Sequence, residues 1–493
     1  MDAEAEKKMV TLLTNRFNRW WNNQRISTPD FKRRDFRYLI KKLDEPKAVT
    51  LIGPRQIGKT TVVMQIIREL IEKRNVNPKR ILYAQFDDVE LRLLSPDNLL
   101  LGVLEVYQKY VLMEDLNLAK SDVYLFFDEV QRVPDWAEQV KALHSANSRL
   151  RILATGSAGF SISQKSKETL PGRQELFTMY PLKFIDALCL YDSVVMETFG
   201  KERCARLDAT GYELRAGFEE AVSKKSFSGF FEFCKGIYME TAPNESGINA
   251  ALGRYFAKGG YPEIVITKDA SACQKLLRSY ANDVIVKDLM PWFKIRDFST
   301  AEKLLFLLAS VSGEQLNVNE LLKRMPGSNL QTVNKYISYF ESLNLLGRAP
   351  VYSGSKMGSA KHPKIYFFDV GLRNAILGTL DASIPDTEKG HIAETVAYDH
   401  IMRLAYKLNA ASPGHVSCFQ SKRGEVDFVL GLPRHSLKLP IEIKFRENVG
   451  NLKGMYEFLE ITKGKMGIVV TENSLELKDG IMFIPLWMFL LLC

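Results

Sequence analysis

Cysteine is scarce in this sequence, and its spacing excludes two common classes of site. Six of the 493 residues are cysteine and no two of them form a Cys-x-x-Cys pair, so neither a zinc framework nor a redox motif is indicated. The six are Cys189, Cys204, Cys234, Cys273, Cys418 and Cys493. We expect them to be reduced thiols of a cytoplasmic protein.

Long apolar runs, internal repeats and low-complexity stretches are also absent. No run approaches the roughly 20 apolar residues that cross a bilayer. The first residues, MDAEAEKK, carry too much charge for a signal peptide. The sequence therefore predicts a protein without a membrane span, and we interpret the final apolar stretch, PLWMFLLLC, as a packed terminal segment.

The overall charge is mildly basic. The formal net charge is +9, which favours an anionic partner such as DNA, although a charge surplus that only serves solubility is an alternative. The length suggests about two to four domains.

A phosphate-binding loop is the clearest motif. Residues 48–70 read AVTLIGPRQIGKTTVVMQIIREL, which predicts a short buried strand, a G-x-x-x-x-G-K-T loop and an amphipathic helix. Backbone N–H groups of such a loop wrap the β-phosphate, Lys59 reaches the β- and γ-phosphates, and the Thr60 hydroxyl binds Mg²⁺. The candidate nucleotide-binding residues are Gly53, Pro54, Arg55, Gln56, Ile57, Gly58, Lys59, Thr60, Thr61, Asp128 and Ser157.

Two later segments fit the same site. Residues 123–131, VYLFFDEVQ, predict a buried strand that ends in an acidic pair, in which Asp128 holds Mg²⁺ and Glu129 polarises the attacking water. Residues 149–158, RLRILATGSA, predict another strand whose carboxyl end carries Thr155 and Ser157, either of which can sense the γ-phosphate. With a strand over residues 80–88, these segments predict a doubly wound α/β domain.

These motifs, together with LPGRQELFTMYPLKF (170–184) and FAKGGYPEIV (256–265), resemble the AAA+-type P-loop ATPases of archaea and bacteria that carry a C-terminal DUF4143 domain. The resemblance implies ATP and Mg²⁺ as cofactors and implicates Arg173 as an arginine finger. A plain structural salt bridge is the alternative role of Arg173, while Arg149 and Arg151 are the other finger candidates. A finger that acts in trans requires a homo-oligomer, up to a hexameric ring. We interpret Arg55 as a solvated loop residue. Residues 192–249 match no motif.

The segment from 298 to 380 predicts a winged helix-turn-helix. Three helical patterns precede two strand patterns, RAPVYS and KIYFFDV, and Gly347 is expected to end the third helix. In that helix Leu330, Val333, Ile337 and Phe340 form a predicted buried stripe. Asn329, Gln331, Asn334, Lys335 and Ser338 occupy the opposite face. Such a face can enter the major groove while wing residues contact phosphates, and we assign Lys356, Lys361, His362 and Lys364 to the wing. A protein-interaction module is the alternative.

The C-terminal segment places charged residues inside apolar strands. In EVDFVL and PIEIKF, the period of two puts Glu442 and Lys444 on one face, and pairing of the two strands would bring Asp427 beside them. Asp, fourteen residues and Glu-x-Lys resemble the PD-(D/E)XK nuclease core, in which Glu394, expected in the first turn of a helix, matches the helix-borne acid. The resemblance implies a metal site of Glu394, Asp427 and Glu442, with Lys444 beside the scissile phosphate. The alternatives are a buried ion pair that fixes strand register and a nuclease fold that binds nucleic acid without cutting it.

The sequence thus predicts an α/β protein in four parts. These are an AAA+ P-loop ATPase core (1–190), a helical lid or linker (191–297), a winged helix-turn-helix (298–380) and a nuclease-like α/β domain (381–493). Our hypothesis is an Mg²⁺-dependent ATPase that acts on DNA. The alternatives are an ATP-driven remodeller of branched DNA with a non-cleaving nuclease fold, and a nucleotide switch that binds a protein partner.

Overall fold

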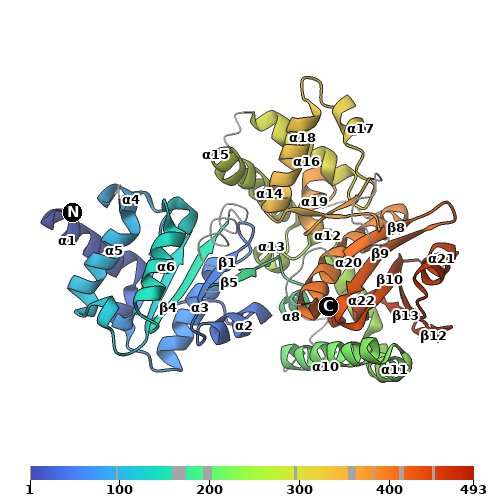
Figure 1. The fold of residues 1–493 in the computed structure, drawn as a ribbon, viewed down its shortest axis with the longest axis horizontal. Coiled ribbons are helices and arrows are strands. Elements are labelled where there is room, and N and C mark those ends of the chain that lie inside the picture. Colours follow the sequence, from blue (N-terminus) through green and yellow to red (C-terminus); the bar gives the residue numbers. More distant parts are fainter. Residues whose placement is uncertain are drawn as a thin grey trace. The chain divides into compact units, whose positions relative to one another are not determined.

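A computed structural model describes residues 2–95, 98–157, 174–191, 203–293, 297–352, 362–380, 384–409, 416–446 and 450–493. The chain forms two compact units (Figure 1). Unit 1 comprises Met1–Tyr180, Asp288–Lys294 and Ser342–Asn344, and unit 2 comprises Pro181–Lys287, Ile295–Glu341 and Leu345–Cys493. Among the described residues, no helix is both long enough and apolar enough to cross a membrane.

Unit 1 is built on a five-stranded parallel sheet in the order β2-β3-β4-β1-β5. The strands are β1 (Ala48–Ile52), β2 (Ile81–Gln85), β3 (Val123–Asp128), β4 (Leu150–Gly156) and β5 (Gln174–Thr178). Every residue of β1 and β3 is buried, as expected for central parallel strands. The predicted mixed α/β architecture is confirmed, but the edge strand β5 was not predicted because its residues lack a strand-like apolar pattern.

Several helices of unit 1 bury apolar side chains. In α3, Val62, Val63, Ile66 and Ile67 are buried, which confirms the predicted stripe. The helices are α1 (Ala3–Leu12), α2 (Arg34–Lys42), α3 (Lys59–Glu72), α4 (Val89–Leu94), α5 (Leu99–Tyr107), α6 (Trp136–Ala146) and α15 (Met290–Phe293).

Unit 2 contains a six-stranded mixed sheet in the order β12-β13-β11-β10-β9-β8. Its strands are β8 (Val416–Gln420), β9 (Glu425–Leu432), β10 (Leu437–Lys444), β11 (Gly467–Thr471), β12 (Glu476–Lys478) and β13 (Ile481–Pro485). Antiparallel pairing of β9 with β10 matches Phe428 with Ile441, so Asp427 and Glu442 are the next residues along each strand. The predicted pairing is therefore confirmed.

Helices make up much of the rest of unit 2. They are α8 (Phe184–Leu190), α10 (Arg203–Lys224), α11 (Ser228–Thr241), α12 (Glu245–Lys258), α13 (Pro262–Ile266), α14 (Ala270–Asp283), α16 (Phe298–Ser310), α17 (Val318–Lys323), α18 (Leu330–Ser342), α19 (Val370–Leu377), α20 (Asp386–Asn409), α21 (Lys453–Thr462) and α22 (Leu486–Leu492). The α22 side chains are all buried, which agrees with a packed terminal segment.

Three helices and a two-stranded sheet occupy the segment expected to be a winged helix. After α16, α17 and α18 come β6 (Leu346–Ala349) and β7 (Lys364–Phe367), which pair antiparallel. In α18, Val333, Ile337 and Phe340 are buried as predicted, but Leu330 at the first turn is 48% exposed. The helix ends at Ser342, and Gly347 lies in β6 instead of ending the helix.

The Gly-Gly-Tyr-Pro motif has a packing role in unit 2. The Gly260 N–H donates to the Asp369 carboxylate over 2.7 Å, and its carbonyl accepts from Leu182 over 2.6 Å. At Gly371 in α19, a Cβ would lie 1.9 Å from the Lys258 carbonyl oxygen, so α12 and α19 pack in close backbone contact. Small residues are therefore required where these helices meet.

Candidate functional site

The phosphate-binding loop of unit 1 connects β1 to α3. Gly53 has φ +156°, and a Cβ there would lie 2.2 Å from the Met179 carbonyl oxygen. Gly58 has φ +90° directly before Lys59, the first residue of α3. Glycine is needed at both positions for these reasons, and the loop leaves the backbone N–H groups at the start of α3 available for an anion. Pro54, Gln56 and Ile57 complete the loop, and Thr61 follows in the first turn of α3.

Lys59 is buried, and its ammonium is held by the loop itself. Its Nζ donates to the carbonyl oxygens of Gly53 and Pro54 over 2.9 and 2.8 Å. Burial lowers the pKa of Lys59, against the opposing effect of the nearby carboxylates. The lysine is thus positioned at the loop, as the sequence predicted.

Asp128, at the carboxyl end of β3, collects three hydroxyl donors. Thr60 and Tyr83 donate to Oδ2 over 2.7 and 2.8 Å, and Thr155 donates to Oδ1. Burial, followed by the adjacent Glu129, raises the pKa of Asp128. The Thr60 hydroxyl and the Asp128 carboxylate are oxygen ligands of the kind that Mg²⁺ prefers, so the donor set fits this ion.

Glu129 lies beside this pair in a left-handed backbone conformation, with φ +55°. Its Oε2 accepts from the Gln131 amide and from the Ser157 hydroxyl, the latter over 3.2 Å. The predicted residues at the end of β4 contact different carboxylates, because Thr155 contacts Asp128 whereas Ser157 contacts Glu129 and, at a shorter distance, Asp288.

Asp288 is a part of this site that sequence analysis missed. It belongs to unit 1, and its carboxylate accepts from Arg55 Nε and a terminal guanidinium nitrogen over 2.9 and 2.8 Å. The Ser157 hydroxyl is 2.9 Å from Asp288 Oδ1. Burial raises the pKa of Asp288. The only signal was an acid within the apolar run VIVKDLMPW.

The interpretation of Arg55 as a solvated residue is therefore wrong. Its side chain is 13% exposed and forms a two-nitrogen ion pair with Asp288.

The arginine-finger candidates are distributed differently. Arg173 lies outside the described residues. Arg149 and Arg151 stand at the amino end of β4, where both form ion pairs with Asp122. Since the phosphate-binding loop lies at the carboxyl end of the neighbouring strand β1, neither arginine belongs to the nucleotide site of its own unit.

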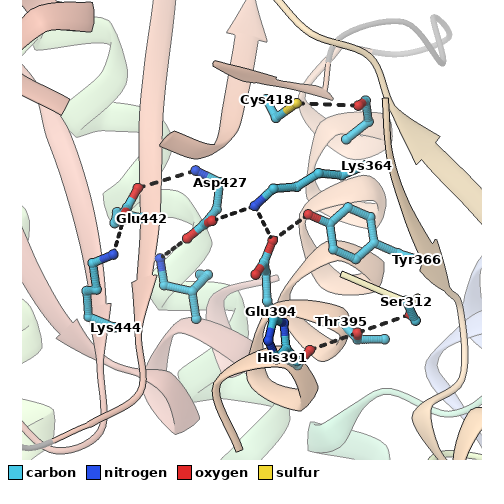
Figure 2. A network of polar contacts seen from close by, with 12 residues as sticks. Ser312, Lys364, Tyr366, His391, Glu394, Thr395, Cys418, Asp427, Glu442 and Lys444 are labelled. Carbon is cyan, nitrogen blue, oxygen red and sulfur yellow. Dashed lines mark hydrogen bonds and ion pairs between the residues drawn. The ribbon is translucent and has the colours of Figure 1, made fainter. Parts of the chain in front are cut away.

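A second polar site lies inside unit 2 (Figure 2). Glu442 Oε2 accepts from the Asp427 backbone N–H over 3.3 Å, and Lys444 Nζ is 2.5 Å from Glu442 Oε1. Asp427 Oδ2 accepts from the Ile443 N–H over 2.9 Å. The structure thus brings Asp427, Glu442 and Lys444 together, as their strand positions predicted.

Lys364 enters the same site from β7, and its assignment to an exposed wing is wrong. Its Nζ lies 2.9 Å from Glu394 Oε1 and 2.9 Å from Asp427 Oδ1, and only 6% of its side chain is exposed (Figure 2). Of the other wing candidates, His362 is exposed, whereas Lys356 and Lys361 lie outside the described residues.

Glu394 joins the site from α20. The helix begins at Asp386, so Glu394 lies in its third turn and not in the first, as the sequence had suggested. The Tyr366 hydroxyl also donates to Glu394 Oε1, over 2.5 Å. Burial, followed by the Asp427 charge, raises the pKa of Glu394 to about 8 and that of Glu442 to about 7.

The predicted metal ligands of unit 2 do not fit a metal ion in this arrangement. Among the residues that the structure describes, no group of three or more His, Cys, Asp or Glu side chains can hold one. Glu394 and Asp427 face the ammonium of Lys364 instead.

Comparison with known protein families matches three segments of the chain. A family model described as an AAA domain matches residues 45–188, and DUF4143, a domain of unknown function, matches residues 389–489. A second domain of unknown function, DUF8612, matches residues 249–383.

Two proteins described as uncharacterized are similar over most of the chain. One, from Haemophilus influenzae, is 21% identical over 416 residues, 83% of this chain and 86% of that protein. The other, from Methanocaldococcus jannaschii, is 22% identical over 393 residues, 79% of this chain and 73% of that protein.

Solved structures show more distant similarity. A Walker-type ATPase of Pyrococcus abyssi aligns with TM-score 0.36 and 14% identity, covering 72% of this chain and 99% of that one. The ORC1 protein of Aeropyrum pernix in complex with DNA aligns with TM-score 0.27 and 16% identity, covering 73% and 96%.

Proposed function

We propose that this chain, which carries an AAA-type P-loop domain and a DUF4143 domain, hydrolyses ATP and couples the hydrolysis to action on DNA. The observation that carries the proposal is the placement of Lys59, Thr60, Asp128 and Glu129 at one edge of the parallel sheet. These are the cation, metal ligands and base that phosphoryl transfer requires.

The described side chains divide the work of hydrolysis. When ATP binds, the Lys59 ammonium exchanges its contacts with the loop carbonyls for contacts with the β- and γ-phosphates, whose charge it neutralises. Thr60 and Asp128 would hold Mg²⁺, which supplies positive charge against the phosphate oxygens when bound. Glu129 orients a water whose oxygen bonds to the γ-phosphorus while the bond to the β–γ bridging oxygen breaks, releasing ADP, phosphate and one proton. Ser157 keeps the Glu129 carboxylate in place.

The exposed face of α18 is the proposed DNA-binding element. Gln331, Asn334, Lys335 and Ser338 are all exposed on it, and amide and hydroxyl groups of this kind can contact base edges or phosphates. Asn329, predicted for the same face, instead caps the helix by accepting from the Thr332 N–H over 2.8 Å. Of the four exposed side chains, Lys335 alone is cationic. A single positive charge suits weak or shape-dependent binding better than tight sequence recognition.

Between the DNA-acting hypotheses, the contacts of Lys364 favour remodelling without cleavage. A metal-dependent nuclease needs its carboxylates free for a divalent cation. Glu394 and Asp427 are instead engaged by a lysine. We therefore propose an ATP-driven action on DNA, such as branched DNA, in which the C-terminal domain does not cut.

The test compares ATP turnover with duplex, single-stranded and branched DNA at several salt concentrations. We expect DNA to stimulate turnover and the stimulation to fall steeply with salt. Lys59→Ala should lose nucleotide binding, and Glu129→Gln should retain binding but lose at least about 100-fold in turnover. Wild-type turnover by Glu129→Gln would refute the role of that residue.

A matched pair of lysine variants tests the DNA-binding face. Lys335→Glu should weaken DNA binding roughly tenfold, whereas Lys303→Glu, also exposed but on α16, should leave it within about twofold. Turnover that is indifferent to every DNA form would support the alternative of a nucleotide switch with a protein partner.

A further inference from the structure

The polar site of unit 2 holds five ionisable side chains in a buried volume. Three are carboxylates, from Glu394, Asp427 and Glu442, and two are ammonium groups, from Lys364 and Lys444. The exposed fractions of the five side chains lie between 5% and 19%. Buried carboxylates at this density stay ionised only with compensating positive charge, from a metal ion or from side chains.

Lys364 supplies that charge at the point where two elements meet. Its Nζ is equidistant, at 2.9 Å, from one oxygen of Glu394 on α20 and one oxygen of Asp427 on β9 (Figure 2). A divalent cation shared by these two carboxylates would need the same position. The ammonium and the metal ion therefore exclude each other.

The backbone of Lys364 is fixed by pairing on both of its sides. As the first residue of β7, it pairs with Ala349 of β6, and on the other side it forms a bridge with Gln315. Its side chain is thus delivered by a paired strand, and leaving the site would require loss of that pairing or rotation of a buried side chain.

Most of the other carboxylate oxygens also accept from groups of this chain. Asp427 Oδ2 and Glu442 Oε2 accept backbone N–H groups, and Glu442 Oε1 accepts from Lys444. Tyr366 donates to the Glu394 oxygen that faces Lys364. Five of the six carboxylate oxygens thus accept from a donor within this chain, whereas a ligand set for a hard cation would present several free oxygens.

We infer that the ammonium of Lys364 takes the place of the metal ion in this nuclease-like centre, so the centre is complete without a divalent cation. The lysine joins β7 and α20 to the six-stranded sheet, and metal-dependent phosphodiester cleavage is excluded as long as it stays there. This inference concerns unit 2 alone and does not depend on ATP or DNA binding in the proposed function.

The test counts Mn²⁺ ions bound to the nucleotide-free full chain by electron paramagnetic resonance, using MnCl₂ as the probe. Wild type and Asp427→Asn should bind the same number of ions at sub-millimolar affinity. Lys364→Met keeps most of the side-chain volume but removes the charge, and it should gain one Mn²⁺ site that the double variant Lys364→Met/Asp427→Asn lacks.

Two outcomes overturn the inference. One is a wild-type Mn²⁺ site that disappears in Asp427→Asn. The other is a folded Lys364→Met variant, with a cooperative melting transition, that gains no site. If Lys364→Met does not fold, the comparison of wild type with Asp427→Asn still decides, since it requires only those two proteins.

The melting temperature gives an independent readout. Addition of 1 mM Mn²⁺ should shift the melting temperature of wild type no more than that of Asp427→Asn. It should raise the melting temperature of Lys364→Met, because an ion that binds only the folded state stabilises that state. An Mn²⁺-dependent rise in wild type that Asp427→Asn abolishes would also contradict the inference.

Discussion

Asp288 places a negative charge beside the phosphate-binding loop, in contact with Arg55 and Ser157. The negative charge of Asp288 repels the triphosphate of ATP. Asp288→Asn removes that charge but keeps an oxygen that accepts hydrogen bonds. We expect the Kd for ATP to fall by about three- to tenfold, since tenfold corresponds to about 1.4 kcal/mol. Titration with a fluorescent ATP analogue measures the change.

The control for this variant is Asp283→Asn, on the same stretch of chain. Asp283 forms an ion pair with Lys287 at the end of α14, so its substitution should leave the Kd unchanged. Equal or weaker ATP binding by Asp288→Asn would show that the electrostatic prediction is wrong. Weaker binding would in addition indicate that the carboxylate supports the site by orienting Arg55.

Glu394 makes stability depend on pH. Its pKa is about 8 in the folded protein against an ordinary value of 4.5, so between these values the folded state binds more protons than the unfolded state. The contribution of Glu394 to stability is therefore greatest below about pH 4.5 and is lost as pH rises towards 8. Relative to wild type, Glu394→Gln should melt at progressively higher temperature from pH 5 to pH 8.

Melting curves at pH 5, 6.5 and 8 check this prediction. The exposed Glu476, changed to Gln, serves as the control and should give a melting temperature that runs parallel to wild type across the range. A constant difference between Glu394→Gln and wild type would mean that Glu394 has the same charge in both states throughout.

At the scale of elements, the contact between α12 and α19 depends on one missing side chain. Gly371→Ala would place a Cβ 1.9 Å from the Lys258 carbonyl oxygen, so the helices must separate. We expect a loss of about 2–4 kcal/mol in the free energy of unfolding, in the range of core overpacking and strain. Urea denaturation measures it.

Gly253 in α12 is the matched control, because a Cβ there meets nothing within 4 Å. Gly253→Ala should stabilise the protein by about 0.5–1 kcal/mol through helix propensity. Similar effects of the two substitutions would disprove the close helix contact.

Element-level prediction succeeded where periodicity was informative. The stripe in α3 and the facing positions of Asp427 and Glu442 followed from periods of 3.6 and 2. Prediction failed at the edge of a sheet and at the beginning of a helix. Strand β5 lacks an apolar pattern, and α20 extends N-terminal of His391 through polar residues that carry no stripe.

At the scale of the whole molecule, a trans-acting arginine would make hydrolysis depend on assembly. Arg173 is assigned this role only because its sequence segment resembles the ATPase family named above. Mixing Arg173→Ala with Glu129→Gln subunits should restore about a quarter of the wild-type turnover, because a random mixture pairs an intact arginine with an intact base at that fraction of interfaces. Purely monomeric protein in the presence of ATP, measured by light scattering, would exclude a trans role.

The sequence by itself determined the nucleotide site and the pairing of Asp427 with Glu442. Those residues lie within single motifs or on neighbouring strands, where local spacing dictates geometry. Only the tertiary structure decided that Asp288 binds Arg55 and that Lys364 reaches Glu394 and Asp427. These partners are separated by 233, 30 and 63 residues. A charged residue carries no local mark of its distant partner, because the pairing arises when folding buries both charges in one place.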